Sequence, residues 1–351
     1  MERKPDKFAV VYSFFNNYVL LENEVIPRMQ KFQDQVILIV VDDKSCKEEY
    51  VRGLELCHSN NIIFLQNQGK GVANAVDTAV KYLQHNEIAD RDWIFCAQQD
   101  IYPKEPSFFV QFRRYVETIE GNSLVGAVGF NALDEYYSGD STRDGLLGSF
   151  FLSKKPTAAD RLEFICSLKI LKHLVRSPID LFNTWKRFNG QKRAFSPRTF
   201  RNFQKIRNQC SATFAIELPM WAFVAINLDS WRVNIRPTTG LIFHLWFNDV
   251  AMQFLSQSHQ ILVFPDLYLE NDQQIKTKYG FMANSADAGR NLQLSQVEQY
   301  GNHLEIFRTR WGFDYETPWK FSRYIQNRYA GTLVAAHFNH DIRKGPIHFT
   351  S

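Results

Sequence analysis

Strand-like and helix-like segments alternate over residues 7–133, and this alternation most constrains the fold. The run VILIVVDD at 36–43 is almost continuously aliphatic, which is typical of a parallel strand buried on both faces. Similar apolar runs lie at 7–14, 61–67, 92–100 and 124–133, with amphipathic helical patterns between them. The pattern predicts an α/β fold with a mostly parallel central sheet flanked by helices.

A long polar and basic stretch at 134–212 interrupts this alternation. Within it, residues 154–207 hold 14 Lys and Arg against 3 Asp and Glu, although the whole chain carries a net charge of only +4. A strand-like pattern returns at 212–231, and a helical pattern at 247–258 and a strand-like run at 260–269 follow it. We therefore expect one domain in two halves, 1–133 and 213–313, separated by a basic and largely helical insertion and followed by a C-terminal extension from 314 to 351.

The composition excludes several classes of protein. With 351 residues and 45% hydrophobic content the chain can bury a large core, so disorder is not expected. No apolar run reaches the roughly 18 to 20 residues of a membrane-spanning helix, and the start MERKPDKF is unlike a signal peptide. The five cysteines form no C-x-x-C pair, so neither a disulfide framework nor a cysteine zinc site is indicated. These features predict a cytoplasmic protein.

Polar residues gather where the predicted strands end. The second strand ends in Asp42 and Asp43, the third runs into NQGKGVANA at 67–75, and the fourth ends in QQD at 98–100. The carboxyl ends of parallel strands meet at one edge of a sheet, where open α/β sheets bind their ligands. The sequence therefore predicts a ligand site at this edge.

These segments, in this order, resemble family 2 glycosyltransferases with the nucleotide-sugar-binding fold called GT-A. VVDDKS looks like the family's D-D/G-S motif, NQGKGVANA is similar to its N-x-G-x-x-x-A-x-N helix start, and QQD stands where D-x-D is usual. The pair Asn248 and Asp249 takes the place of its E-D helix start, and LEIFRTRWG at 304–312 is similar to its aromatic-x-x-K-W-G ending. The resemblance spans roughly 7–133 and 214–313.

The resemblance implies an edge that holds a nucleotide-diphosphate sugar. The implied nucleotide-binding residues are Ser13, Asp42, Asp43, Asn67, Gly69, Asn74, Gln98 and Gln99. Independently of the family, a carboxylate at a strand end can accept hydrogen bonds from ribose hydroxyls or a base N–H, and glycines let backbone approach a ligand. A turn-forming role for the aspartates and a capping role for Asn67 are the alternatives.

Asp100 is the expected ligand of Mn²⁺ or Mg²⁺. A divalent ion held by a carboxylate and by diphosphate oxygens neutralises charge on the leaving group. QQD keeps a single carboxylate, to which Gln98 or Gln99 would add an amide oxygen; otherwise Asp100 binds substrate or caps its loop. The metal-binding His of many relatives is not recovered in FPDLYLEND, where Glu270 or Asp272 would have to replace it.

Asp249 is the expected general base, which would take the proton of an acceptor hydroxyl. An acidic residue is also common at the start of a helix in any protein. Asn248 and Ala251 depart from the family pattern, because relatives usually carry Glu and often a second Asp there. His244 is expected to pack in the core or a loop rather than to bind a ligand.

Trp221, Trp246 and Asn248 are the expected acceptor contacts, because aromatic rings stack on the C–H faces of sugars. Aromatic residues in strands more often belong to the core, which is the alternative. In the insertion, the amphipathic pattern at 164–176 suits peripheral contact with a membrane that carries a lipid-linked acceptor, whereas a helical subdomain over the site is the alternative.

The sequence thus predicts an inverting glycosyltransferase that acts on a glycan or lipid-linked acceptor of the surface-polysaccharide type. One alternative is a catalytically silent GT-A domain that binds nucleotide or glycan, favoured by QQD, Asn248 and Ala251. The other is a nucleic-acid-binding protein that uses 154–207 as a basic platform. Because no recognisable nucleic-acid-binding motif is present, we do not expect that partner.

Overall fold

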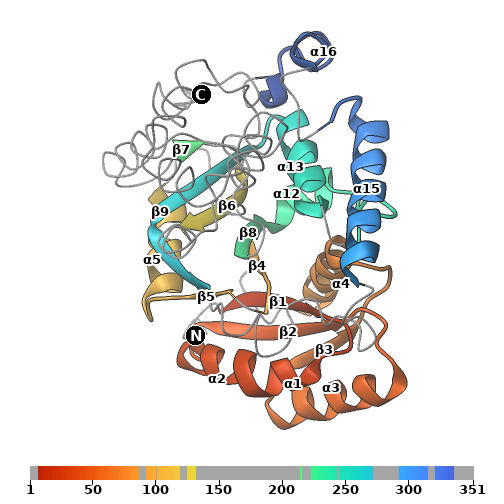
Figure 1. Ribbon diagram of the computed structural model, residues 1–351. Helices are drawn as coiled ribbons and strands as arrows, with labels where there is room; N and C mark the ends of the chain where they lie inside the picture. Colours follow the sequence, from red (N-terminus) through yellow and green to blue (C-terminus); the bar gives the residue numbers. More distant parts are fainter. Residues whose placement is uncertain are drawn as a thin grey trace, which may run out of the picture.

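The computed structural model describes residues 7–86, 92–99, 101–118, 125–131, 214–215, 223–242, 245–271, 292–314 and 321–335. These residues form a mixed α/β structure around one sheet of nine strands (Figure 1). The insertion predicted at 134–212 lies outside the described residues.

The sheet begins with four parallel strands and continues with mixed pairing. The parallel strands are, in spatial order, β3 (Ile63–Gln66), β2 (Val36–Asp42), β1 (Phe8–Phe14) and β4 (Trp93–Ala97). The order continues through β8 (Phe223–Asn227), β6 (Val125–Asn131), β9 (Gln260–Asn271) and β5 (Ile101–Pro103), and β7 (Phe214–Ala215) pairs with β9. β8 runs antiparallel to both of its neighbours, β4 and β6. Both predicted halves therefore contribute strands to the same sheet.

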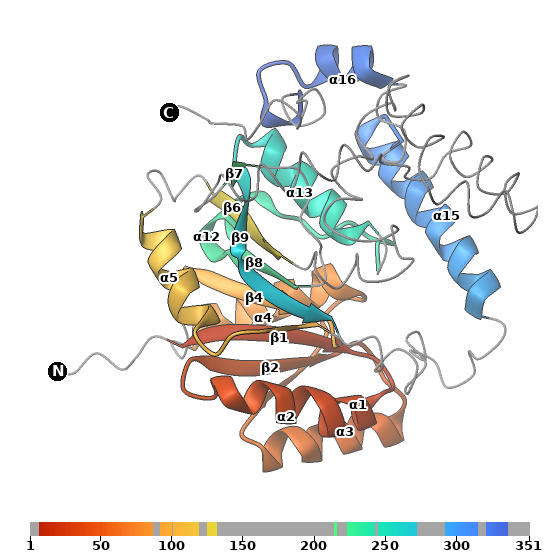
Figure 2. The same cartoon turned by 60° about the vertical axis from the view of Figure 1, so that its left-hand side comes forward.

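Helices cover both faces of this sheet (Figures 1 and 2). On one face lie the helical segment 18–32, α3 (Lys47–Ser59) and α5 (Phe108–Thr118), and on the other lie α4 (Val72–His85), α12 (Leu228–Asn234), α13 (Trp246–Ser256) and α15 (Leu292–Trp311). Alternate residues of β1 serve the two cores, since Val10 and Tyr12 join the first and Ala9 and Val11 the second. Ile325 of α16 (Ser322–Arg328) is buried in the second core. The buried sheet predicted from the aliphatic runs is confirmed.

The helix predicted after β1 is divided into short pieces. They are α1 (Tyr18–Leu20), the π-helical turn η1 (Leu21–Val25), α2 (Ile26–Met29) and the 3₁₀ turn η2 (Gln30–Phe32). In the π-helical turn the Ile26 N–H bonds to the Leu21 carbonyl, five residues back. Pro27 has no N–H to continue the α-helical ladder, which accounts for the wider turn beside it.

The strand-like pattern predicted through 231 ends earlier in the structure. β8 stops at Asn227, and α12 begins at once. The Asn227 side-chain oxygen accepts a hydrogen bond from the Ser230 N–H at 2.9 Å, so it caps the new helix. The apolar residues of this stretch do not distinguish a buried strand from a buried helix, whereas the capping Asn does.

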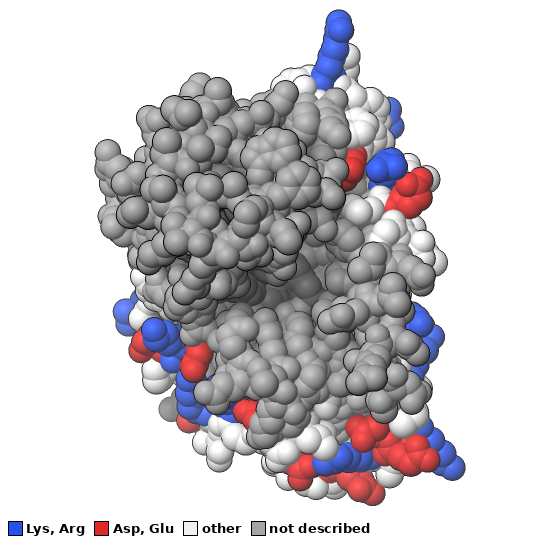
Figure 3. Space-filling model, viewed as in Figure 1, with Lys and Arg blue, Asp and Glu red and all other residues white. Residues whose placement is uncertain are grey.

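The described surface carries both signs of charge. Figure 3 shows acidic and basic side chains mixed along the lower edge of the view, where α3 and its neighbours lie in Figure 1. Arg52 of α3 pairs there with Glu22 at 2.8 Å and with Glu49 at 3.8 Å. Among the described residues no helix is long and apolar enough to cross a membrane.

Candidate functional site

The carboxyl ends of the four parallel strands lie along one edge of the sheet. The final residues of β1, β2 and β3, namely Phe14, Asp42 and Gln66, are register partners across the sheet. β4 ends beside them at Ala97, which pairs with Tyr12. The predicted nucleotide-binding residues lie at these strand ends or in the segments that follow them. The fold therefore brings them to one edge of the sheet, as expected.

Asp42 is an internal anchor of this edge. Its carboxyl group is fully buried and accepts a hydrogen bond from the Tyr18 hydroxyl at 2.8 Å on Oδ1. Its Oδ2 accepts from the backbone N–H groups of Lys44 and Ser45, each at 3.1 Å. Lys44 adopts a left-handed conformation with φ +67°. Asp42 thus has the turn-forming geometry that the sequence left open, and nucleotide contact by Asp42 stays a prediction.

Tyr18, which donates the hydrogen bond to Asp42, is itself fixed by packing. Its ring stacks on Phe14 with a centroid distance of 5.4 Å. A Cβ atom on Gly53 would lie 2.4 Å from the Tyr18 ring, so the middle of the 13-residue helix α3 needs a glycine there. Glycine costs helix stability, and this packing explains why the helix contains one.

Asp43 lies at the same edge but is only partly buried. Its Oδ1 accepts hydrogen bonds from Asn67 Nδ2 at 2.7 Å and from the Gly71 N–H at 2.9 Å. Burial raises the pKa of Asp43, and the charge of Asp42 acts in the same direction, whereas the donors on Gly71 and Asn67 and the charge of Lys70 lower it. Of the two neighbouring aspartates, Asp43 is the one that keeps some exposure to solvent.

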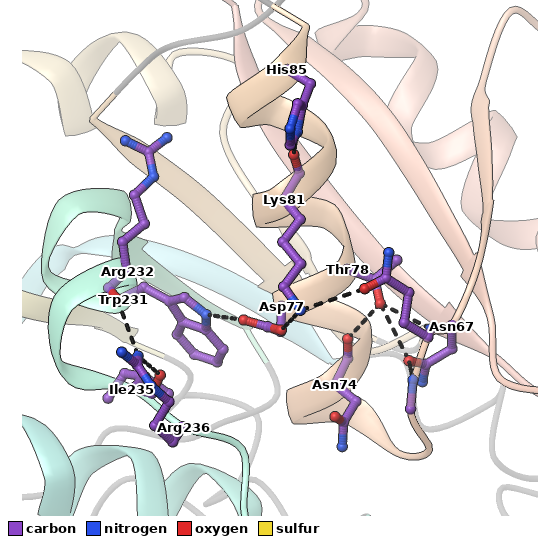
Figure 4. Close-up of polar contacts among 12 residues, drawn as sticks. Asn67, Asn74, Asp77, Thr78, Lys81, His85, Trp231, Arg232, Ile235 and Arg236 are labelled. Carbon is purple, nitrogen blue, oxygen red and sulfur yellow. Dashed lines mark hydrogen bonds and ion pairs between the residues drawn. The ribbon is translucent and has the colours of Figure 1, made fainter.

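The loop 67–71 closes around the buried Asn67 side chain. Asn67 Nδ2 also donates to the Gly71 carbonyl at 3.1 Å, and its Oδ1 accepts from the Gly69 N–H at 3.1 Å. The Thr78 hydroxyl lies between Asn67 and Asn74 and donates to the Asn74 carbonyl at 2.8 Å (Figure 4). Asn67 therefore organises the turn before α4. It does not cap the helix, because the N-cap residue is Gly71 and no side chain makes a cap hydrogen bond there. Ligand contact by Asn67 stays a prediction.

Two glycines let this loop approach its neighbours. A Cβ on Gly69 would lie 2.4 Å from the Asn74 side-chain oxygen. Gly71 has φ +87°, and a Cβ there would lie 2.4 Å from the Ile242 backbone. The next N–H, of Val72, donates to the Ile242 carbonyl at 2.9 Å. Gly71 is thus where the nucleotide-side loop touches the segment that precedes α13.

Helix α4 is fixed on its other side by α12. Trp231 Nε1 donates to Asp77 Oδ1 at 3.2 Å, and Lys81 pairs with the same carboxylate at 2.8 Å (Figure 4). This contact joins residues 154 positions apart in the sequence. Helix α4 is therefore held at its start by Ile242 and further along by Trp231.

Ser13 and Gln99 form a second pair at the edge. The Gln99 Nε2 group donates to the Ser13 carbonyl at 2.5 Å, and the Tyr102 hydroxyl donates to the Gln99 carbonyl. Gln98 is half-buried beside them, and Asp100, the predicted metal ligand, lies outside the described residues. Within the described ranges, no three His, Cys, Asp or Glu side chains gather into a possible metal site.

Asp249 is at the centre of a buried network in the first turn of α13. The residue is 1% exposed. Its Oδ1 accepts from Trp311 Nε1 at 2.9 Å. Its Oδ2 accepts from three side chains, the Thr238 hydroxyl at 2.8 Å, Gln253 Nε2 at 2.9 Å and Arg310 Nη1 at 3.1 Å.

Burial raises the pKa of Asp249, while the charge of Arg310 and the three uncharged donors lower it. A carboxylate with a raised pKa binds a proton more readily than an ordinary Asp, as a general base requires. A base must also reach its substrate, and here both oxygens are covered. The base role of Asp249 therefore stays a prediction, and it requires that one of the covering donors move aside.

The motif LEIFRTRWG and the helix start at 248–249 meet in this network. Arg310 and Trp311 come from the end of α15, and the Arg310 guanidinium lies over the Trp311 ring, 5.2 Å from its centroid. Thr238 and Gln253 were not predicted from the sequence as partners of Asp249. Gln253 follows Asp249 by four residues, a helical spacing that could have indicated it, whereas no local signal marks Thr238.

The other predicted residues take various positions. Trp246 is 1% exposed and packs edge-on against Phe247, so a stacking role for it requires rearrangement of the start of α13. Asn248 is half-buried in the first turn of α13. Glu270 lies in β9, 4.0 Å from Arg28. Trp221, His244 and Asp272 lie outside the described residues.

No protein-family model matches the chain, and no curated protein matches it in sequence. Among solved structures it is similar to a mannosyltransferase from Pyrobaculum calidifontis in complex with GDP-Man and Mn²⁺, with 12% identity and a TM-score of 0.42 over 94% of this chain and 82% of the other. It is also similar to glucosyl-3-phosphoglycerate synthase from Mycobacterium tuberculosis in complex with Mn²⁺, UDP and glucosyl-3-phosphoglycerate, with 13% identity and a TM-score of 0.37 over 84% and 80%.

A third similar structure is S. aureus TarS, with 14% identity and a TM-score of 0.40 over 90% of this chain and 45% of the other. TM-scores below 0.5 carry no functional argument, so membership of family 2 stays a prediction. The function has to be argued from the residues at the sheet edge.

Proposed function

We propose that this protein is a glycosyltransferase that moves a sugar from a nucleotide-diphosphate sugar to a hydroxyl of a glycan or lipid-linked acceptor. The observation that carries the proposal is the row of strand ends at which Asp43, Asn67 and Gly71 meet, joined through Ile242 to the segment before Asp249. Group transfer needs a site for the donor and an acid–base group on one scaffold, and we assign these roles to the edge around Asp43 and to Asp249.

The donor nucleotide binds at the edge formed by the loops after β1 to β4. The partly exposed Asp43 carboxylate accepts a hydrogen bond from a ribose hydroxyl or a base N–H. The diphosphate lies near the start of the 14-residue helix α4, where the helix dipole and the exposed Lys70 favour an anion. The N–H groups of Gly71 and Val72 already donate to Asp43 and to Ile242 there. Ser13, Gln98 and Gln99 complete the edge beside β4, with Asp42, Gly69 and Asn74 supporting its loops.

A divalent cation, Mn²⁺ or Mg²⁺, would be held by Asp100 together with the donor's phosphate oxygens. When bound, it would neutralise negative charge on the departing nucleoside diphosphate. Support for it comes from the sequence position of Asp100 after β4. Measuring donor binding with EDTA and with Mn²⁺ tests it directly.

Asp249 acts as the general base in a single displacement. The acceptor oxygen forms a bond to the anomeric carbon, the bond from that carbon to the diphosphate breaks, and Asp249 receives the acceptor's proton. One of its four donors must give way to the acceptor hydroxyl. The Thr238 hydroxyl is the chemically equivalent donor, and it comes from a partly exposed segment.

The acceptor lies against the start of α13, near Asn248, with Trp221 as a further contact. Trp246 joins it if the first turn of α13 rearranges. The basic insertion at 134–212 contacts the cytoplasmic surface of a membrane when the acceptor is lipid-linked, because its positive charge suits anionic headgroups.

A catalytically silent domain that binds nucleotide or glycan is the second candidate. The burial of Asp249 under four donors is the observation that favours it, because a sealed carboxylate cannot accept a proton from a substrate. Both candidates allow nucleotide binding, and only the transferase predicts turnover.

A thermal-shift screen with UDP-, GDP-, dTDP- and CMP-linked sugars, each with Mn²⁺ and with EDTA, tests donor binding. We expect one nucleotide to raise the melting temperature, and the shift to shrink in Asp43→Asn but not in Asp34→Asn, whose side chain is exposed before β2. A shift that persists in EDTA would remove the metal from the proposal, and the absence of any shift would overturn the transferase and leave a silent domain that binds glycan.

A further inference from the structure

The segment 236–242, which we call the strap, links the Asp249 network to the loop 67–71. It leaves α12, crosses between α13 and α15, and ends beside the start of α4. Its contacts fall into two groups, one at each end. The proposed function uses Thr238 as a donor to Asp249 and both sites that the strap joins, but it assigns no role to the mechanical connection between them.

One end of the strap is fastened to α13. Gln253 makes two hydrogen bonds to the Arg236 backbone. Its Oε1 accepts from the Arg236 N–H at 2.8 Å, and its Nε2 donates to the Arg236 carbonyl at 3.2 Å. The Thr238 hydroxyl donates to Asp249 Oδ2 at 2.8 Å. Gln253 Nε2 also donates to that oxygen at 2.9 Å, so the carboxylate and the strap share one donor.

The other end of the strap is fastened to the loop 67–71. The Val72 N–H donates to the Ile242 carbonyl, and Gly71 packs against the Ile242 backbone. The Gly71 N–H in turn donates to both oxygens of Asp43, at 2.9 and 3.0 Å. A shift of Ile242 therefore acts on the peptide group next to the one that holds Asp43, and the two are joined through the Gly71 Cα.

The middle of the strap is a tight turn with little slack. The Leu241 N–H donates to the Thr238 carbonyl at 3.2 Å, and Gly240 has φ +92°. A residue with positive φ at the third position is typical of a type II turn, which favours glycine. A Cβ on Gly240 would lie 2.7 Å from Ile306 of α15, so the turn is also packed from outside. Thr238 and Ile242 are thus joined by a short, stiff connection.

We propose that the strap couples the Asp249 carboxylate to the loop 67–71, and that Thr238 is a positioning residue for the nucleotide-diphosphate site. The coupling is a property of the fold, while the identity of the ligand rests on the proposed function. Any event that releases Thr238 from Asp249 loosens the anchor of Ile242 and hence of Gly71 and Asp43. By linkage, a ligand that fixes the loop 67–71 also strengthens the Thr238 contact.

Hydrogen exchange of the protein without ligand tests the coupling. Thr238→Val removes the hydroxyl while keeping the side-chain shape, Thr238→Ser keeps a hydroxyl, and Thr239→Val changes an exposed neighbour. We expect exchange at Gly71 and Val72 to accelerate about fivefold in Thr238→Val, corresponding to one ordinary hydrogen bond, and to stay near the parent rate in the other two variants. Unchanged exchange at these amides in Thr238→Val would overturn the proposal.

Thr238→Ala serves as a second variant in case Val does not fold, with the same expectation. The nucleotide identified by the thermal-shift screen then gives a second readout, because Thr238→Val is expected to raise its dissociation constant by a similar factor. If exchange accelerates but the parent binds no nucleotide, the coupling stands and the proposed function fails. If the parent binds nucleotide and Thr238→Val exchanges like the parent, the coupling fails alone.

Discussion

Asp43 and Asp249 are two raised-pKa carboxylates that the fold treats in opposite ways. The donors to Asp43 come from one β-α-β stretch, 24 and 28 residues away, and include a backbone N–H. The donors to Asp249 are all side chains, and they come from Thr238 and Gln253 nearby and from Arg310 and Trp311, 61 and 62 residues away. Asp43 keeps an exposed portion, whereas Asp249 is sealed.

The difference shows how each centre can serve the proposed reaction. A carboxylate held by backbone at an open edge is ready to bind a ligand without rearrangement. A carboxylate covered by side chains from distant segments keeps these contacts only while those segments are packed together. It becomes accessible to a substrate when one donor leaves. The comparison therefore predicts that substitutions around Asp249 lower the stability of the folded protein. Substitutions around Asp43 should act mainly on the sheet edge.

Removing the Asp249 carboxylate should give the largest effect. In Asp249→Ala three uncharged donors lose their partner, and each buried donor left unpaired costs about 1 to 3 kcal/mol of the free energy of unfolding. The Arg310 guanidinium, whose side chain is 31% exposed, is hydrated instead. Urea denaturation measures this loss. Asp249→Asn keeps the shape and one acceptor oxygen, so it should lose less stability.

Asp249→Asn also separates the two candidate functions. We expect it to abolish sugar transfer, because an amide cannot act as the base. Nucleotide binding should stay intact, because the remaining amide oxygen can still accept the Thr238 hydrogen bond. Transfer at the parent rate in this variant would contradict the base assignment.

Gly71→Ala should give the next largest effect, because it strains the junction between the two centres. Its φ of +87° and the approach of Ile242 both oppose a side chain, which together should cost about 3 kcal/mol. Gly331→Ala is a matched control with φ +77° and no neighbour within 4 Å, so it measures the backbone strain alone. An equal loss of stability in both variants would show that contact with Ile242 contributes nothing.

Tyr18→Phe should weaken the edge without affecting the Asp249 network. It removes the hydroxyl that donates to the buried Asp42 carboxyl group and should cost about 2 kcal/mol. Tyr50→Phe is the control, since its ring also packs against Phe64 but lies in the partly exposed part of α3. A similar loss of stability in the two variants would argue against the anchoring role of Tyr18.

The pH dependence should show the smallest effect. Burial raises the pKa of Asp249 in the folded chain, so the unfolded chain loses this proton first as the pH rises. From about pH 4 upward, the free energy of unfolding of the parent should therefore fall relative to Asp249→Asn, until the pH passes the raised pKa. Arg310 is the charged group that faces Asp249 within the described residues, and it acts against this shift. A difference independent of pH would contradict the raised pKa.

Much of the edge around Asp43 could be predicted from sequence, because its parts are local. The aliphatic run of β2 followed by Asp42 and Asp43, and the glycines of the loop 67–71, carry their structural meaning within a few residues. What the sequence could not decide is which aspartate faces inward. That depends on Tyr18, which comes from another element and reaches Asp42 across β1 and α3.

The Asp249 network was less predictable because its members are distant in sequence. The family resemblance pointed to both 248–249 and 304–312 but not to their contact. Thr238 carries no local signal, since its role depends on a turn after α12 that the strand-like pattern through 231 obscured. Likewise, the short strand β5 depends on pairing with β9 rather than on its own composition.

Release of nucleoside diphosphate from the identified donor, with and without a glycan acceptor, tests the central claim most directly. We predict turnover by the parent that increases with acceptor, that falls in Asp43→Asn through weaker donor binding, and that is lost in Asp249→Asn with donor binding unchanged. Donor binding by the parent without any release of nucleoside diphosphate, in the presence of Mn²⁺ and a panel of acceptors, would contradict the claim that this edge performs sugar transfer.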